Sequence, residues 1–190
     1  MWQRILRISF LVLGLLILVV SIVRTTLEMT IADEKNDNLR KVPIGTDMIN
    51  REGLWEKIDY KFPETMMLPS NSFYFVKKIR DSLWIGFAKT PIDKSRLALL
   101  LADKKMEEVR IMERQGIDKQ IIIGTTIEAI NKLKLASDEL KKDQSNRIEN
   151  QQIQNQINQT IYVYKKIIQT LEIEEEEKQE LTWRVEEIFQ

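Results

Sequence analysis

The chain has 190 residues, and its 29 basic and 29 acidic side chains give a formal net charge of zero. This balance provides no general electrostatic attraction to nucleic acid or to a charged membrane surface. Cysteine and histidine are both absent, which excludes disulfides, thiolate nucleophiles, imidazole bases and the usual zinc sites. Glycine and proline are few, and the many Lys, Glu, Gln, Leu and Ile residues predict an all-α fold.

An apolar segment lies near the N-terminus. Residues 8–23 (ISFLVLGLLILVVSIV) carry no charge, and Ile5 and Leu6 extend the apolar stretch to about 19 residues, enough for a transmembrane helix. A cleaved signal peptide is the alternative, but the sequence VSIVRTT offers no A-x-A cleavage pattern. We therefore predict an uncleaved anchor over residues 1–24, embedded in the lipid bilayer through residues 5–23.

Basic residues flank this segment on both sides, so their count alone does not decide its orientation. Arg4 and Arg7 precede the segment, and Arg24, Lys35, Arg40 and Lys41 follow it. The short basic stretch before the span is similar to the n-region of an export signal, which favours a cytoplasmic N-terminus. The expected localisation is the cell membrane, as a single-pass protein with its C-terminal domain extracytoplasmic.

Residues 25–67 have the composition of a tether. Their first half is polar and without period, and their second half contains helix breakers at Pro43, Gly45, Gly53 and Pro63. The isolated Trp55, Ile58, Tyr60 and Phe62 indicate that this second half packs partly on the domain. The alternation in IDYKF, residues 58–62, leaves a short strand open, although we expect an extended segment there.

Residues 68–190 have a helical period and predict an array of about five antiparallel helices. The first helix is expected to begin at a cap among Ser70, Asn71 and Ser72. Its apolar residues recur at three- and four-residue steps and predict a core-facing stripe made of Phe73, Val76, Ile79, Leu83 and Phe87, with Trp84 beside it.

The next helix is predicted from Pro91 to about Gln115, with Thr90 as its cap and Gly116 as its left-handed stop. Its LALLLA segment, residues 97–102, is apolar on nearly every side and predicts the central element. Asp118 is expected to cap a third helix, residues 119–142. The KDQSNR segment then predicts a turn, although a continuous helix remains open.

The last two predicted helices have clear apolar stripes. The fourth helix shows Ile157, Ile161, Tyr164, Ile168 and Leu171, and the short final helix shows Leu181, Val185 and Ile188. The acidic run Glu174–Glu177 is interpreted as a solvated first turn rather than a calcium site, because consecutive helical carboxylates fan outward.

No residue pattern in the chain indicates catalysis. We find no Gly-rich phosphate loop, paired catalytic carboxylates or nucleophile elbow, so we predict no catalytic residues, no cofactor, no metal and no nucleic-acid partner. The basic and aromatic residues of the first helix are interpreted as a core helix with a solvated face. Four apolar residues remain outside the main stripes or on a thin apolar edge, and they are the candidate partner surface: Tyr74, Ile85, Ile153 and Ile157.

One stretch resembles a known family. Leu68 to Met112 contains Leu-Pro, then Asn71, Tyr74 and Lys77, and later Asp93, Arg96 and the run LADKKMEE. This pattern is similar to domain of unknown function 5667, a bacterial, helical family usually attached to exported or membrane-anchored chains. This chain has Ser72 where the family tends to have proline. The resemblance implies an extracytoplasmic address and carries no activity.

Three functional hypotheses follow. The leading one is a membrane-anchored extracytoplasmic helical module for protein–protein interaction or a scaffolding role in the cell envelope, with an envelope protein as a possible partner. The alternative is a cell-envelope enzyme that uses carboxylates only, which requires two acids converging in a pocket. A signal-transducing receptor is disfavoured because only about seven residues precede the span.

Overall fold

The computed structural model describes residues 46–49, 55–58, 74–143 and 147–189, together with residues 60, 62, 63, 65, 68 and 69. The predicted anchor and the caps expected at residues 70–72 lie outside these residues. Among the helices that the structure describes, none combines the length and the apolar character needed to cross a bilayer.

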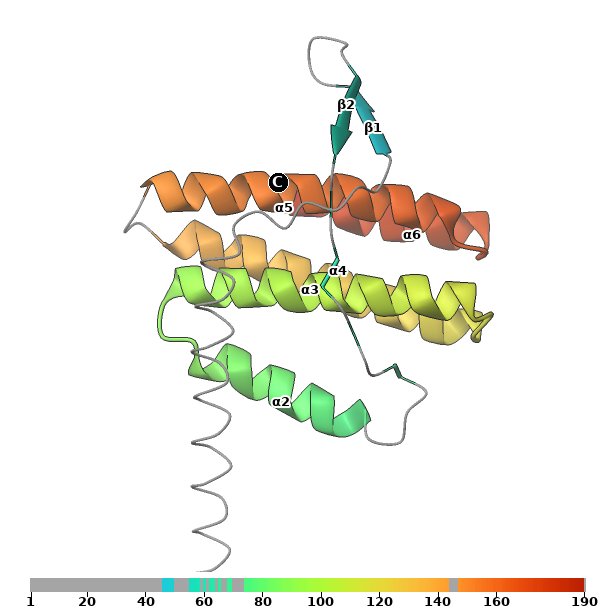
Figure 1. The fold of residues 1–190 in the computed structure, drawn as a ribbon, viewed down its shortest axis with the longest axis horizontal. Coiled ribbons are helices and arrows are strands. Elements are labelled where there is room, and N and C mark those ends of the chain that lie inside the picture. The colour runs from blue at the N-terminus through green and yellow to red at the C-terminus, as the bar shows by residue number, and fades with distance from the viewer. Residues whose placement is uncertain are drawn as a thin grey trace, which may run out of the picture.

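Five α-helices form the described domain, in agreement with the predicted helical bundle. They are α2 (Tyr74–Phe87), α3 (Pro91–Arg114), α4 (Lys119–Lys142), α5 (Arg147–Thr170) and α6 (Glu175–Glu186), and a 3₁₀ turn, η1 (Glu187–Phe189), ends the described chain. The helices α3 and α4 run side by side through the middle. The pair α5 and α6 lies on one side of them, and α2 lies on the other (Figure 1).

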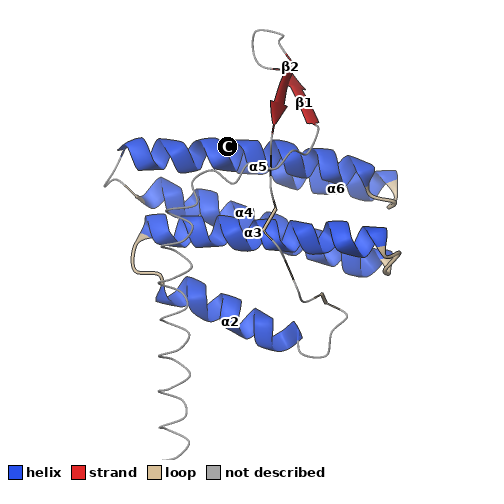
Figure 2. Cartoon of the chain, in the orientation of Figure 1, coloured by secondary structure: helices blue, strands red, loops and turns tan. Residues whose placement is uncertain are grey.

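A short β-hairpin precedes the helices. Strand β1 (Thr46–Ile49) pairs antiparallel with β2 (Trp55–Ile58), so that Thr46 lies opposite Ile58 (Figure 2). The alternating segment 58–62 begins at the last residue of β2, and its described residues Tyr60 and Phe62 lie outside any strand. Phe62 is buried in the core of the helical domain, and Tyr60 packs against that core.

The ends of the helices follow the predicted local chemistry. The Thr90 hydroxyl caps α3, and Pro91 occupies its first turn. Gly116 follows α3 with φ of +64°, a left-handed conformation that favours glycine. The Asp118 carboxylate caps α4. Asp143 is extended after the last residue of α4, so α4 and α5 are separate helices.

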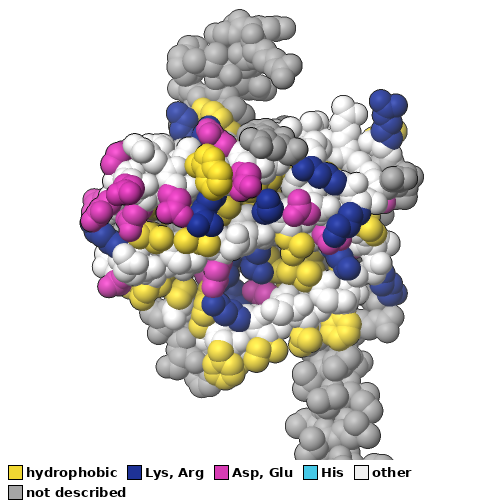
Figure 3. All heavy atoms as spheres, turned by 180° about the vertical axis from the view of Figure 1, so that it is seen from behind, with side chains coloured by type: hydrophobic (Ala, Val, Ile, Leu, Met, Phe, Trp, Pro, Cys, Tyr) yellow, Lys and Arg dark blue, Asp and Glu magenta, His cyan; other side chains and the backbone are white. Residues whose placement is uncertain are grey.

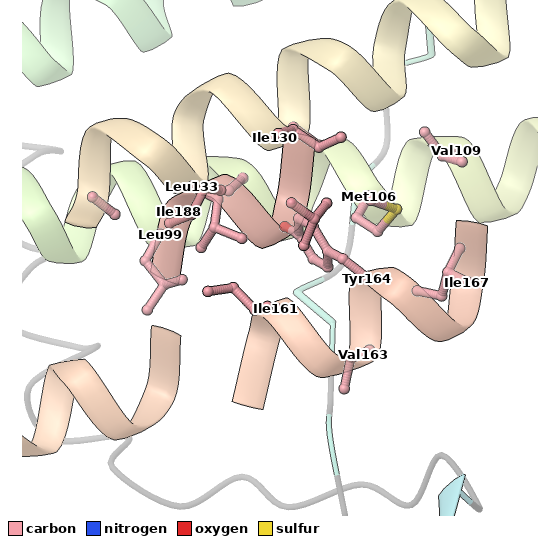
Figure 4. Close-up of a cluster of buried hydrophobic side chains, with 14 of the residues drawn as sticks. Leu99, Met106, Val109, Ile130, Leu133, Ile161, Val163, Tyr164, Ile167 and Ile188 are labelled. Carbon is pink, nitrogen blue, oxygen red and sulfur yellow. The ribbon is translucent and has the colours of Figure 1, made fainter. Parts of the chain in front are cut away.

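The main core lies between α3, α4, α5 and α6 (Figure 4). The LALLLA segment is central, as predicted, since α3 contacts α2, α4 and α5. The predicted stripes of α5 and α6 are also confirmed, because every one of their members is buried: Ile157, Ile161, Tyr164, Ile168, Leu171, Leu181, Val185 and Ile188.

The predicted stripe of α2 is wrong for the members that the structure describes, and Phe73 lies outside the described residues. Val76, Ile79, Leu83 and Phe87 are exposed, and the buried residues of this helix are Tyr74, Lys77, Asp81 and Trp84. These four lie at steps of three and four on the opposite side of the helix. The reason lies in α3, where buried charged residues receive the polar side of α2. The helix therefore packs on the bundle through its polar side and turns its apolar side outward.

This orientation gives neighbouring residues of α2 different expected roles in stability. Trp84 is 6% exposed and packs on Leu97 and Leu101 of α3, whereas Leu83 is 37% exposed. We expect Trp84→Ala to lower the free energy of unfolding by about 2–3 kcal/mol, near the low end for large core truncations because only one side of α2 is packed. Leu83→Ala should cost less than about 0.5 kcal/mol. Denaturant unfolding of both variants checks the difference, and equal losses would contradict the orientation of α2.

Candidate functional site

The outward face of α2 is the most unusual surface of the described domain. Five large apolar side chains of one short helix are exposed there: Phe75 (59%), Val76 (49%), Ile79 (55%), Leu83 (37%) and Phe87 (37%). We call these five residues the outward face. In the space-filling view, hydrophobic side chains form a row along the edge of the molecule where α2 lies (Figure 3). The other large exposed apolar residues, Ile121, Ile148 and Trp183, lie on other helices.

A buried ionic cluster holds α2 in this orientation. Glu108 of α3 is fully buried and binds Lys77 of α2. The Tyr74 hydroxyl donates to Glu108 Oε2 at 2.5 Å, and Lys105 Nζ donates to the Tyr74 oxygen. The Lys105 Nζ also lies 3.4 Å from Glu108 Oε2. Two lysines and one tyrosine thus surround a single buried carboxylate, which satisfies its charge and its hydrogen bonds together.

Glu128 of α4 extends this cluster to the surface. Its carboxylate lies 2.7 Å from Lys105 Nζ and 2.5 Å from Lys78 Nζ. Burial favours a higher pKa for Glu128, but the hydrogen bonds from Lys105 and Lys78 outweigh this effect and lower its pKa below the ordinary value. Glu128 therefore stays ionised and links α2, α3 and α4 through charge.

A small polar pocket of about 250 Å³ lies beside the cluster, between α2, α3 and α4. It is lined by Lys78, Asp81, Ser82, Lys105, Glu128, Asn131 and Lys132. Burial lowers the pKa of Lys132, with Asp81 acting in the opposite direction. Burial, followed by the hydrogen bond to Glu108, raises the pKa of Tyr74 far above its ordinary value, so the phenol stays protonated.

A second polar cluster joins the described part of the tether to the bundle. The Asp103 carboxylate of α3 accepts hydrogen bonds from Tyr60 and from Tyr164 of α5, the latter at 3.0 Å. Tyr60 also lies 2.7 Å from the Thr160 hydroxyl of α5. Beside them, Phe62 stacks on Tyr164 with ring centroids 6.4 Å apart. Tyr60 and Phe62 are therefore seated over α3 and α5.

Burial raises the pKa of Asp103 from 3.8 to about 7, and the hydrogen bonds from the two tyrosines offset part of the rise. Burial likewise raises the pKa of Tyr164, and the nearby Asp103 adds to that effect. The charge of Asp103 therefore changes near neutral pH, at the junction between tether and domain.

The four residues predicted as a partner surface do not come together on the surface. Tyr74 is 7% exposed and belongs to the ionic cluster, while Ile153 and Ile157 are 2% and 0% exposed in the core. Ile85 is partly buried against Trp84 and its partners. Ile153 and Ile157 are buried because the narrow apolar edge of the amide-rich segment of α5 faces the core. Tyr74 is buried because α2 is rotated by half a turn from its expected orientation.

The outward face was visible in the sequence but was assigned to the core. Its amphipathic period is strong, and period alone does not tell whether an apolar side faces a core or another surface. The signal that would separate the two is the polar side of the helix, where Tyr74 and Lys77, three residues apart, both bind the buried Glu108 of α3.

The acidic residues of the described chain do not form a metal site. No group of three or more candidate ligands converges among the residues that the structure describes. Glu174 and Glu177 instead form a reciprocal capping box at the start of α6. The buried carboxylate of Glu108 is neutralised by lysines, and that of Asp103 is bound by tyrosines. Neither arrangement presents a pair of free acids to a substrate.

Comparison with known proteins gives no relative for this chain: no family model, no curated protein and no solved structure matches it. The resemblance to domain of unknown function 5667 therefore stays a prediction. The described domain is a helical bundle in which a buried ionic cluster holds the amphipathic helix α2 with its apolar side facing outward.

Proposed function

We propose that this chain is a membrane-anchored, extracytoplasmic helical module that interacts with other envelope components through the outward face of α2. The predicted anchor over residues 1–24 and its short basic N-terminal stretch support the membrane address. The tether over residues 25–67 separates this anchor from the helical domain. The observation that carries the proposal is the exposure of five large apolar side chains on one side of one helix.

Physical cost is the reason to assign a docking role to this face. Fully burying a large apolar side chain typically contributes about 1.5–3 kcal/mol, and the fold leaves five such side chains of α2 between 37% and 59% exposed. Single exposed apolar residues are ordinary, but a contiguous patch is typical of an interaction site. The ionic cluster prevents α2 from rotating its apolar side inward, because rotation would expose Tyr74 and strip Glu108 of Lys77.

The carboxylate-only enzyme is the weaker reading of the same cluster. Such an enzyme needs two acids that share a site and have distinct protonation states. Glu108 and Glu128 approach the same lysine, Lys105, which lies between them as a common counter-ion. This geometry stabilises both negative charges, so it supports a structural role in seating α2 better than acid–base chemistry.

Labelling of single cysteines tests both the address and the docking role, and the natural chain contains no cysteine to interfere. Ile79→Cys places a thiol in the outward face, and Gln156→Cys places one on the exposed surface of α5 as a matched control. In intact spheroplasts, a membrane-impermeant maleimide should label Gln156→Cys readily. It should label Ile79→Cys several-fold more slowly, because a docked face excludes the reagent.

Two other results would overturn parts of this proposal. Labelling of neither variant until the membrane is permeabilised would place the domain on the cytoplasmic side. Equal labelling rates at the two positions would mean that the outward face is uncovered in the cell, and the docking role would fall. Circular dichroism of both variants verifies that the helical fold is retained.

A further inference from the structure

The exposed charged side chains of α2 and of the turn that follows it are basic, and Lys78 pairs with Glu128 of α4, whose side chain is 38% exposed. Between Tyr74 and Lys89, the exposed charged side chains are Lys78 (52%), Arg80 (41%) and Lys89. Asp81 is the acid of this stretch, and its side chain is only 6% exposed and pairs with Arg80. An apolar face with two phenylalanines and a basic rim is the composition of helices that lie in the interface of an anionic membrane.

We infer that the outward face of α2 docks on the anionic lipid interface of the membrane that carries the anchor, with α2 lying flat on the bilayer. This inference rests on the proposed function and names the surface that the docking face meets. The apolar side chains Phe75, Ile79 and Leu83 enter the boundary between headgroups and acyl chains. The ammonium and guanidinium groups of the rim meet lipid phosphates.

The position of α2 permits this contact. The helix forms one edge of the bundle, and α5 and α6 lie on the far side of α3 and α4 (Figure 1). With 14 residues, α2 is about 21 Å long, and hydrophobic side chains run along its edge of the molecule (Figure 3). A flat surface can therefore meet the whole helix without moving the other elements of the bundle.

The N-terminal part of the chain predicts that the domain lies close to a bilayer. The apolar residues 8–23 are flanked by arginines and predict a membrane anchor in the same molecule. The predicted tether of residues 25–67 lets the domain range about 30–40 Å from the anchor if it behaves as a random coil. Tethering turns docking into an intramolecular step, so even a face of five side chains suffices.

Charge also distinguishes a lipid surface from a second copy of the chain. Two outward faces packed against each other would bring two sets of Lys78, Arg80 and Lys89 close to one interface, where the paired acids Glu128 and Asp81 offset part of the repulsion. Like charges placed close together are unfavourable and suppress association. A membrane rich in anionic headgroups provides the opposite charge over the whole rim.

The test uses the full chain reconstituted in lipid vesicles that contain no other protein. An environment-sensitive fluorophore is attached to Ile79→Cys or, as the control, to Gln156→Cys. In vesicles of phosphatidylethanolamine and phosphatidylglycerol, acyl-brominated lipids should quench the probe at residue 79 at least about twofold more than the probe at residue 156. The difference should shrink in pure phosphatidylcholine, since the rim then loses its anionic partners.

A second variant separates docking from folding. Leu83→Asp in the Ile79→Cys background places a charge at an exposed position, so circular dichroism should stay unchanged while quenching at residue 79 is lost. Equal quenching at residues 79 and 156 would overturn the inference, as would energy transfer between two α2 probes in place of quenching. If quenching is absent but residue 79 is still protected in spheroplasts, the face binds a protein; the proposed function then stands and the lipid inference falls.

Discussion

Replacing Glu108 with alanine is expected to lower the free energy of unfolding by about 3–5 kcal/mol, because the change removes the buried carboxylate that Lys77 and Lys105 share. Glu108 is fully buried, and Lys77 and Lys105 beside it are 7% and 3% exposed. Lys105 keeps Glu128 as a partner. Lys77 also donates to the Thr65 hydroxyl, 3.1 Å away, but it loses the buried carboxylate that it binds in the folded chain.

The chain can relieve part of this cost by releasing α2. Undocking would return Lys77 to water, so hydrogen exchange of α2 should accelerate more in Glu108→Ala than exchange of α3 or α5. Denaturant unfolding of the full chain in detergent gives the global value. Glu180→Ala is the control, because its ion pair with Arg184 joins exposed side chains, and it should change stability by less than about 0.5 kcal/mol. Similarly small losses of unfolding free energy in both variants would show that the ionic cluster does not hold α2 on the bundle.

Loss of the ionic cluster should also affect the proposed docking of α2. If α2 undocks, its outward face is no longer held at an edge of the bundle, and the labelling contrast between residues 79 and 156 should change in the same variant. The Glu108→Gln variant keeps the shape and the hydrogen bond from Tyr74 while it removes the charge. An intermediate stability would therefore attribute the difference between Gln and Ala to packing and hydrogen bonding rather than to charge.

The helices α3 to α6 could be predicted from the sequence because their signals are local. Thr90 and Asp118 cap helices within three residues of their own positions, and Gly116 ends α3 through its own backbone conformation. The stripes of α5 and α6 face the core, and all of their members are buried. Period and capping are enough in such cases.

The orientation of α2 depends on residues far from it in the chain. Tyr74 meets Glu108 across 34 residues, and Lys77 meets it across 31. In the sequence, Lys105 and Glu108 have the spacing of an ordinary exposed ion pair on a helix, so nothing local marks them as buried. The apolar side of α2 therefore predicts burial by pattern, while long-range ionic contacts determine which side is buried.

The cluster at Asp103 was hidden for the same reason. Its partners Tyr60 and Tyr164 lie 43 and 61 residues away along the chain, on the tether and on α5. The sequence indicates only that Tyr60 belongs to a segment with isolated apolar residues and that Tyr164 lies on a core stripe. Their hydroxyl groups converge on one carboxylate only after α3 and α5 have packed.

The stability of the domain should depend on pH through Asp103. Its pKa is raised from 3.8 to about 7 in the folded chain, mainly by burial. Folding therefore favours the protonated acid, and this contribution to stability is complete below about pH 4 and is lost as the pH rises through about 7. The shift corresponds to about 4 kcal/mol over the whole range and to about 2–3 kcal/mol between pH 5 and pH 8. Thermal and denaturant unfolding should both show a less stable domain at pH 8.

Three substitutions test the assignment to Asp103. Asp103→Asn cannot ionise and should remove most of the pH dependence between pH 5 and pH 8, whereas Asp138→Asn, at an exposed position of α4, should leave it unchanged. Tyr60→Phe removes a hydrogen bond that lowers the pKa of Asp103, so the loss of stability should move to higher pH. A pH dependence that survives in Asp103→Asn would place its origin elsewhere. If the assignment holds, the hydrogen bond that Tyr60 donates to Asp103 strengthens as Asp103 ionises, because this bond lowers the pKa of the carboxyl by favouring its charged form.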